Sequence, residues 1–180
     1  MDQLHAAAWT PSLRDLWHRI ESHDLEPDSP LNFTRRLARD KKWRLDFTRS
    51  AIREYRRFCF LAAAASHPVT PSEAVDEVWH THLTYSRDYW DVWCKQVLRR
   101  PLHHDPTQGK EDEQRYFRAQ YAETLALYET YFGPPDPGFW PATHIRFGRP
   151  RSWRIGVERA LLILRSTAGW RRVTGTVGGQ

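Results

Sequence analysis

The sequence predicts an all-α protein: a single helical domain of about five main helices with an irregular, Pro- and Gly-rich, basic C-terminal extension. Apolar residues recur at three- and four-residue spacing in several long segments, as on one face of a helix. No segment alternates apolar and polar residues for long enough to indicate a sheet. We place the helical domain at residues 1–141 and the extension at 142–180, with a short amphipathic helix near 152–166.

The first two predicted helices each begin where a capping side chain precedes proline. Thr10 and Pro11 indicate the N-cap and first position of one helix, because the threonine hydroxyl accepts a backbone hydrogen bond and proline needs no N–H there. Ser29 and Pro30 predict the start of a second, short helix after the breaker LEPDSP. Both helices carry apolar residues at helical spacing, so each is expected to bury one face.

A third and longer helix is expected from 45 to 66. Its last part, FCFLAAAAS, is apolar on most sides, which predicts a place at the centre of the domain. Arg53, Arg56 and Arg57 are predicted to mark its solvent-facing side. The apolar stripe consists of Thr48, Ala51, Ile52, Tyr55, Cys59 and Ala62.

Thr70, Pro71 and Glu73 form a capping-box pattern that predicts a fourth helix, running to about Leu98. A fifth helix is predicted over 111–132, ended by Gly133. Since the third, fourth and fifth helices carry the longest apolar stripes, we expect the fourth to pack between the other two. The predicted inner face of the fifth is Tyr116, Gln120, Tyr121, Thr124, Leu127, Tyr128 and Tyr131.

The fourth helix and the loop after it concentrate the residues that can carry chemistry. Two histidine pairs fall in this segment, His80 with His82 and His103 with His104, among several tryptophans. A buried imidazole needs hydrogen-bond partners, whereas Leu or Phe would fill the same space without them. We therefore expect the candidate functional site here, in an aromatic core.

The helical spacing decides which of these residues can bind one ion together. Asp76 and His80 lie four apart and share a face, whereas His80 and His82 point in nearly opposite directions. With donors from the loop, this pair suits zinc, manganese or non-haem iron. The candidate metal ligands are Asp76, His80, His104 and Asp105, with His103 as another loop donor; the candidate acid–base residues are His82 and His104.

Two function classes stay open from the residues alone. In one, the cluster binds a metal or small ligand and is a catalytic site. In the other, Asp76 interacts with the helix dipole and with His80, the loop histidines form a polar turn, and the protein is a non-catalytic interaction or accessory module. The chain has no Gly-x-Ser-x-Gly elbow and no phosphate-binding glycine loop. Cys59 and Cys94 are expected to be buried structural thiols.

Three runs of the chain carry a resemblance to a known family: PVTPSEAVDEVWHTHLTYSRDYW, RPLHHDPTQG and EQRYFRAQYAETLALYETYFGPPDPGFWP. They resemble the glycine-rich domain-containing protein-like family of bacteria and plants. The resemblance covers roughly residues 32–141 and implies a shared site without naming a reaction. The family's hallmark positions correspond here to Asp76, Trp79, His80, His82, His104 and Asp105. The chain departs from the family in lacking a glycine-rich region, apart from Gly175, Gly178 and Gly179.

Composition and charge limit the cellular compartment and the binding partners that we expect for this protein. Two cysteines give no disulfide framework, the N-terminus shows no secretory pattern, and no stretch approaches about 18 uncharged apolar residues, so we predict a cytoplasmic protein without a transmembrane segment. Residues 142–180 carry eight arginines and one acid. This extension is predicted to bind an acidic protein or an anionic membrane surface, or to pack back on the domain; a nucleic-acid partner is not expected.

Overall fold

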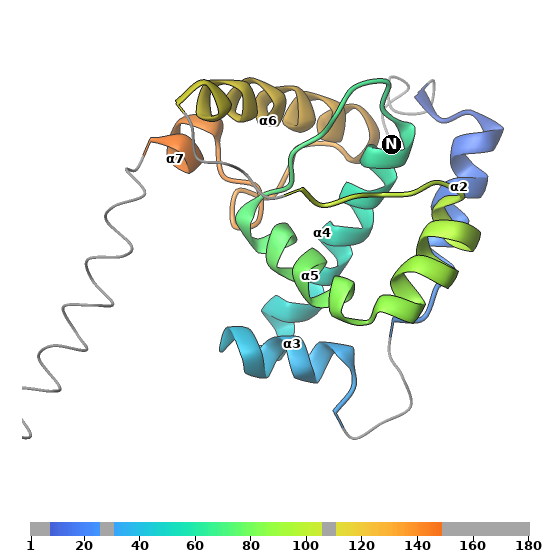
Figure 1. The fold of residues 1–180 in the computed structure, drawn as a ribbon. Coiled ribbons are helices and arrows are strands. Elements are labelled where there is room, and N and C mark those ends of the chain that lie inside the picture. The colour runs from blue at the N-terminus through green and yellow to red at the C-terminus, as the bar shows by residue number, and fades with distance from the viewer. Residues whose placement is uncertain (1–7, 26–30, 106–110, 149–180) are drawn as a thin grey trace, which may run out of the picture. The chain divides into compact units, whose positions relative to one another are not determined.

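Every regular element in residues 8–25, 31–105 and 111–148, which the computed structural model describes, is a helix (Figure 1). The all-α prediction is therefore confirmed for these ranges. The longer helices are α2 (Pro11–Ser22), α3 (Phe33–Lys41), α4 (Leu45–Ala64), α5 (Glu73–Thr84), the π-helix η1 (Asp88–Leu98) and α6 (Glu111–Phe132), and the short α7 (Thr143–Phe147) follows them.

The chain divides after Thr143 into two units, and the domain described here is the first of them. The predicted helix near 152–166 and most of the basic extension lie outside the described residues. Among the helices that are described, none is long and apolar enough to cross a membrane.

The first helix begins as predicted, and the second begins later. The Thr10 hydroxyl accepts a hydrogen bond from the Leu13 N–H at the start of α2. In α3 the cap is Asn32, whose side chain accepts from the Arg35 N–H, so the start predicted at Ser29 and Pro30 was too early. Asparagine is as good a cap as serine, so the caps alone did not separate the two positions.

Helix α4 lies at the centre of the domain, where it contacts α2, α3, α5, η1 and α6 (Figure 1). The central place predicted for this third helix is therefore confirmed, whereas the expectation that the fourth would pack between the third and the fifth was wrong, because α4 itself contacts both α5 and α6. The predicted solvent side of α4 also needs correction. The Arg56 guanidinium donates to the carbonyls of Ile20, Glu21 and His23, and thereby caps the C-terminal end of α2.

A buried carboxylate, which the sequence did not single out, ties α4 to α6. Glu54 accepts hydrogen bonds from the Tyr128 hydroxyl at 2.7 Å, from Trp140 Nε1 at 2.9 Å and from Arg57 at 2.9 Å. Three donors replace the water that the carboxylate loses on burial. Of the residues predicted for the inner face of α6, Gln120, Tyr121, Thr124 and Tyr128 are buried, but Tyr116 is exposed.

The predicted fourth helix is two helices, and its start is not at Thr70. Ser72 caps α5 by accepting from the Val75 N–H. Thr70 instead faces α6, where its N–H donates to Thr124 Oγ1 at 3.0 Å and its hydroxyl contacts Gln120. The helix then breaks at Tyr85, whose ψ of 56° is outside the helical region.

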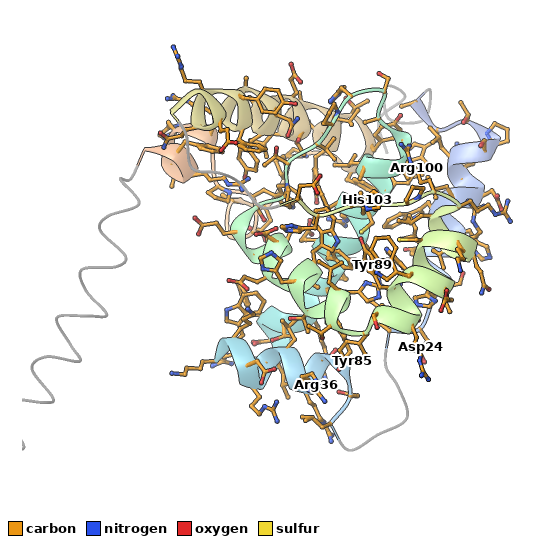
Figure 2. All side chains as sticks on the ribbon, viewed as in Figure 1. Asp24, Arg36, Tyr85, Tyr89, Arg100 and His103 are labelled. Atoms are coloured by element: carbon orange, nitrogen blue, oxygen red, sulfur yellow. The ribbon has the colours of Figure 1, made fainter. Side chains whose placement is uncertain are left out.

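Packing against α3 accompanies this break. The Tyr85 ring meets Phe33 edge-on at 5.3 Å, and the Arg36 guanidinium lies 5.8 Å from its centroid (Figure 2). After the break the chain continues as η1, in which backbone hydrogen bonds span five residues rather than four.

Candidate metal site

Helix α5 separates the residues of its Trp-His-x-His motif onto two faces. His80 points outward, with 49% of its side chain exposed, and Asp76 lies one turn before it on the same face. Trp79 and His82 point into the core, and His82 has no exposed side-chain surface. The motif therefore contributes side chains both to the surface and to the core. The candidate site lies at the surface, whereas we expected it inside the aromatic core.

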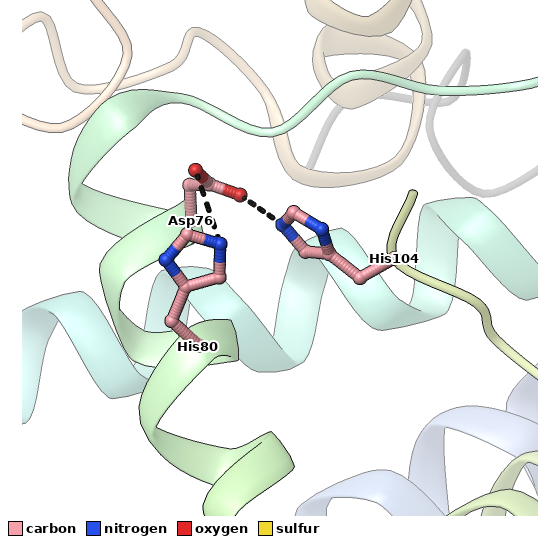
Figure 3. A group of neighbouring side chains, drawn as sticks. All are labelled: Asp76, His80 and His104. Carbon is pink, nitrogen blue, oxygen red and sulfur yellow. Dashed lines mark hydrogen bonds and ion pairs between the residues drawn. The ribbon is translucent and has the colours of Figure 1, made fainter. Parts of the chain in front are cut away.

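Asp76, His80 and His104 form one cluster (Figure 3). His104 reaches α5 from the segment after η1, and its Nε2 lies 2.8 Å from Asp76 Oδ1. His80 Nε2 lies 3.9 Å from Asp76 Oδ2, and the two imidazole rings are 4.5 Å apart. One ligand atom from each residue lies within 4.8 Å of the other two. Ligand distances of about 2.0–2.2 Å to one ion would require the three side chains to adjust around it.

The structure brings together three of the predicted ligands and leaves the others apart. Asp105 is exposed and does not belong to the cluster, so the prediction of Asp105 as a ligand finds no support in the geometry. His103 is also exposed, and its ring packs against Trp90 at 5.4 Å instead. The two neighbouring histidines therefore face different partners, His103 facing Trp90 and His104 facing Asp76.

A buried hydrogen-bond chain fixes the segment that carries His104. Trp79 Nε1 donates to the Tyr89 hydroxyl at 2.8 Å, and this hydroxyl donates to the Leu102 carbonyl. The Trp79 indole also packs edge-on against the His104 ring, with centroids 4.4 Å apart. Burial raises the pKa of the Tyr89 phenol far above its ordinary value, so Tyr89 keeps the proton that it donates. No pattern in the sequence indicated this role for Tyr89.

His82 belongs to a second, inner network. Its Nδ1 lies 2.8 Å from the Tyr55 hydroxyl and its Nε2 lies 2.8 Å from Asp88 Oδ2, while His23 Nε2 lies 3.1 Å from Asp88 Oδ1. Burial lowers the pKa of His82, against the opposing effect of Asp88, so the ring is neutral at pH 7. The Nδ1 atom then accepts from Tyr55, and Nε2–H donates to Asp88.

Asp88 holds this network at its partly exposed end. Burial alone would raise the pKa of Asp88, but the hydrogen bond from His82 and the nearby His23 outweigh it and lower the pKa. In a continuous α-helix, residues six apart point about 120° away from each other. Asp88 reaches His82 only because the helix breaks at Tyr85, which is why the sequence pattern missed the pair.

The inner network changes the interpretation of His82. A side chain without exposed surface, bonded at both ring nitrogens, cannot meet a substrate without rearrangement. His82 is therefore a core residue in this structure, and the candidate acid–base role predicted for it has no geometric support.

Comparison with known proteins places this cluster within a recognised family region. Residues 18–122, more than half of the chain, match the family model described as UCP032817-like. The matched range includes all three clustered residues and the whole inner network. No curated protein and no solved structure matches the chain.

Proposed function

The chain belongs to the UCP032817-like family, and we propose that Asp76, His80 and His104 bind a divalent transition metal, with zinc, manganese and iron as the candidates. The convergence of three ligand atoms from two separate segments carries this proposal. Two imidazoles and one carboxylate form a donor set that suits these ions. The proposal retains the metal prediction from the sequence with Asp105 removed from the ligand set.

The cluster is partly exposed, so an ion bound there could exchange water or a small ligand at its free coordination positions. His80 is half exposed and Asp76 is one-third exposed, so a bound ion would remain accessible from solvent. Three protein ligands leave at least one position for water or a small ligand, as in catalytic zinc sites rather than closed structural ones. When bound, such a metal would act as a Lewis acid or lower the pKa of a coordinated water. We propose a catalytic or ligand-binding role on this basis.

The surrounding residues would support such a site. Metal-binding imidazoles require fixed ring orientations, and residues beyond the ligands commonly supply them. Here Trp79 packs on the His104 ring while Tyr89 fixes the backbone at Leu102. The loop ligand is thereby held near the two helical ligands before any metal binds.

Metal content and affinity test the proposal directly. We expect about one equivalent of metal per chain by elemental analysis, and binding of Zn²⁺ or Mn²⁺ to the chelator-treated full-length protein by calorimetry. His104→Gln should weaken the affinity for the metal at least about tenfold, because the variant lacks one of the three ligands. His103→Gln is the matched control and should bind like the wild type. Absence of binding in the wild type would refute the proposal.

One observation favours the second function class, in which the cluster is structural. Asp76 and His104 already form a 2.8 Å hydrogen bond that closes the cluster without any ion. In that case His104→Gln should lower the free energy of unfolding by about 1–3 kcal/mol, and Zn²⁺ should leave the melting temperature of the wild type unchanged. The protein would then act as an interaction or accessory module.

We also propose that the basic extension over 142–180 binds an acidic protein or an anionic membrane surface in the cytoplasm. Replacing its arginines by glutamine in the full chain should abolish co-sedimentation with anionic vesicles. The link to the glycine-rich domain-containing protein-like family stays a prediction based on the Trp-His-x-His resemblance.

A further inference from the structure

The π-helix η1 arranges its side chains differently from an α-helix of the same sequence. Trp90 and Arg99 are nine residues apart, so a regular α-helix would place them about 180° apart, on opposite faces. Because π-helical hydrogen bonds span one more residue, nine residues complete about two turns, and both side chains come to one side. Residues four and five after Trp90, which are Cys94 and Lys95, flank the same stripe.

This stripe lines a groove of about 410 Å³. Its lining residues are Trp90, Cys94, Lys95, Arg99, Arg100 and Pro101. Arg99 ends the helix in the left-handed conformation, with φ of 56°, and the N–H groups of Arg99 and Arg100 both donate to the Cys94 carbonyl. This closure turns the chain so that Arg100 and Pro101 also line the groove.

The groove combines an exposed indole with cations. Trp90 is 37% exposed and packs against His103, which lies on the segment that continues from Arg100 (Figure 2). Lys95 pairs with Asp91 at 2.7 Å, and Arg100 donates to the Ala63 carbonyl at 2.9 Å. A backbone carbonyl leaves the charge of Arg100 uncompensated.

Arg99 gives the groove its most available cation. Among the described residues its guanidinium has no hydrogen-bond or ion-pair partner. A guanidinium binds carboxylate and phosphate with two parallel hydrogen bonds, which a lysine cannot do. The groove therefore has a planar apolar surface and unpaired positive charge within one small volume.

We propose that this groove binds a small organic anion that carries a planar ring, with the ring against Trp90 and the anionic group on Arg99 and Arg100. Its volume lies in the range of small-molecule sites. A stacked ring would use the exposed indole surface, and the carboxylate or phosphate would accept hydrogen bonds from the two guanidinium groups. The Cys94 thiol forms an unreactive part of the lining, because burial raises its pKa.

The groove is separate from the proposed metal site. None of its lining residues belongs to the Asp76, His80 and His104 cluster. Binding can therefore be measured in the presence of a chelator, which removes any contribution from a metal ion.

Calorimetry and ligand-observed NMR on the full-length chain in EDTA test this proposal. The probes are an aryl carboxylate, indole-3-acetate, and a nucleoside monophosphate, AMP, with adenosine as the uncharged control. We expect at least one anionic probe to bind and adenosine to bind about tenfold more weakly. The preference between the two anions distinguishes a carboxylate ligand from a phosphate ligand.

Two variants and two matched controls locate the binding. Arg99→Gln and Trp90→Leu should each weaken the anionic probe about tenfold. Arg53→Gln and Tyr116→Leu, which change an exposed arginine and an exposed aromatic residue outside the groove, should bind like the wild type. Arg99 and Trp90 are both solvent-exposed, and circular dichroism checks that the variants remain helical.

Three outcomes would overturn the proposal. The first is that no anionic probe binds the wild-type chain at millimolar concentration. The second is equal binding of AMP, indole-3-acetate and adenosine. The third is binding that neither Arg99→Gln nor Trp90→Leu weakens relative to the two controls.

Discussion

Removing the Tyr89 hydroxyl tests whether the inner core positions the loop that carries His104. This hydroxyl accepts from Trp79 and donates to the Leu102 carbonyl, and the Tyr89 side chain is fully buried. Tyr89→Phe keeps the ring but leaves both partners without their buried hydrogen bond. Each of the two stranded groups costs about 1–3 kcal/mol, so we expect a loss of about 2–6 kcal/mol in the free energy of unfolding. That is a large fraction of a typical domain's stability, about 5–15 kcal/mol.

Urea denaturation of the full-length variant measures this loss, and a titration with Zn²⁺ measures its effect on the site. With the Leu102 anchor gone, His104 should reach the cluster less often, and the affinity should fall about tenfold or more. Tyr116→Phe is the matched control, because its hydroxyl bonds to Gln120 at an exposed position.

A stability loss no larger than that of the control would refute the hydrogen-bond reasoning. A large stability loss with unchanged Zn²⁺ affinity would separate the two claims: the chain of hydrogen bonds would stabilise the core without positioning His104.

The remaining predictions concern the buried groups and the ligand set. Burial lowers the pKa of His82 below its ordinary 6.5, so the unfolded state binds more protons than the folded state. The free energy of unfolding should therefore fall as the pH drops below about 6.5. In a series of urea denaturations at different pH values, His82→Gln should flatten this dependence. Glu54→Ala should cost about 3–5 kcal/mol in the same assay, because it leaves Trp140 Nε1 and the Tyr128 hydroxyl proton without an acceptor and Arg57 without its carboxylate; a cost below about 1 kcal/mol would contradict this. Asp105→Asn should leave Zn²⁺ affinity within about twofold of the wild type by calorimetry, since Asp105 lies outside the cluster.

Local signals predicted the parts of the fold that depend on local interactions. The α2 start at Thr10 and the α6 end before Gly133, which has φ of 78°, both follow from side chains acting on their own backbone. Thr70 shows the limit of such signals. Its hydroxyl is a good cap, but Gln120 lies fifty residues away and engages it, so Ser72 caps α5 instead.

The candidate site was predictable to the same extent. Asp76 and His80 are four residues apart, so helix geometry alone predicts that they share a face, and in the structure they do. Which loop residue joins them does not, because His103, His104 and Asp105 offer similar donors. The choice depends on Trp79, which packs against His104 and leaves its neighbours on other sides.

The break at Tyr85 connects the features that the sequence did not reveal. Without it, Asp88 would point away from His82, and the imidazole would be buried without a partner for Nε2. The same Asp88 is the first residue of η1, so the bond to His82 lies where the π-helical winding begins. That winding in turn brings Trp90 and Arg99 to one side of the helix. The break at Tyr85 and the π-helix that follows it thus give His82 its partner and also form the groove beside Trp90.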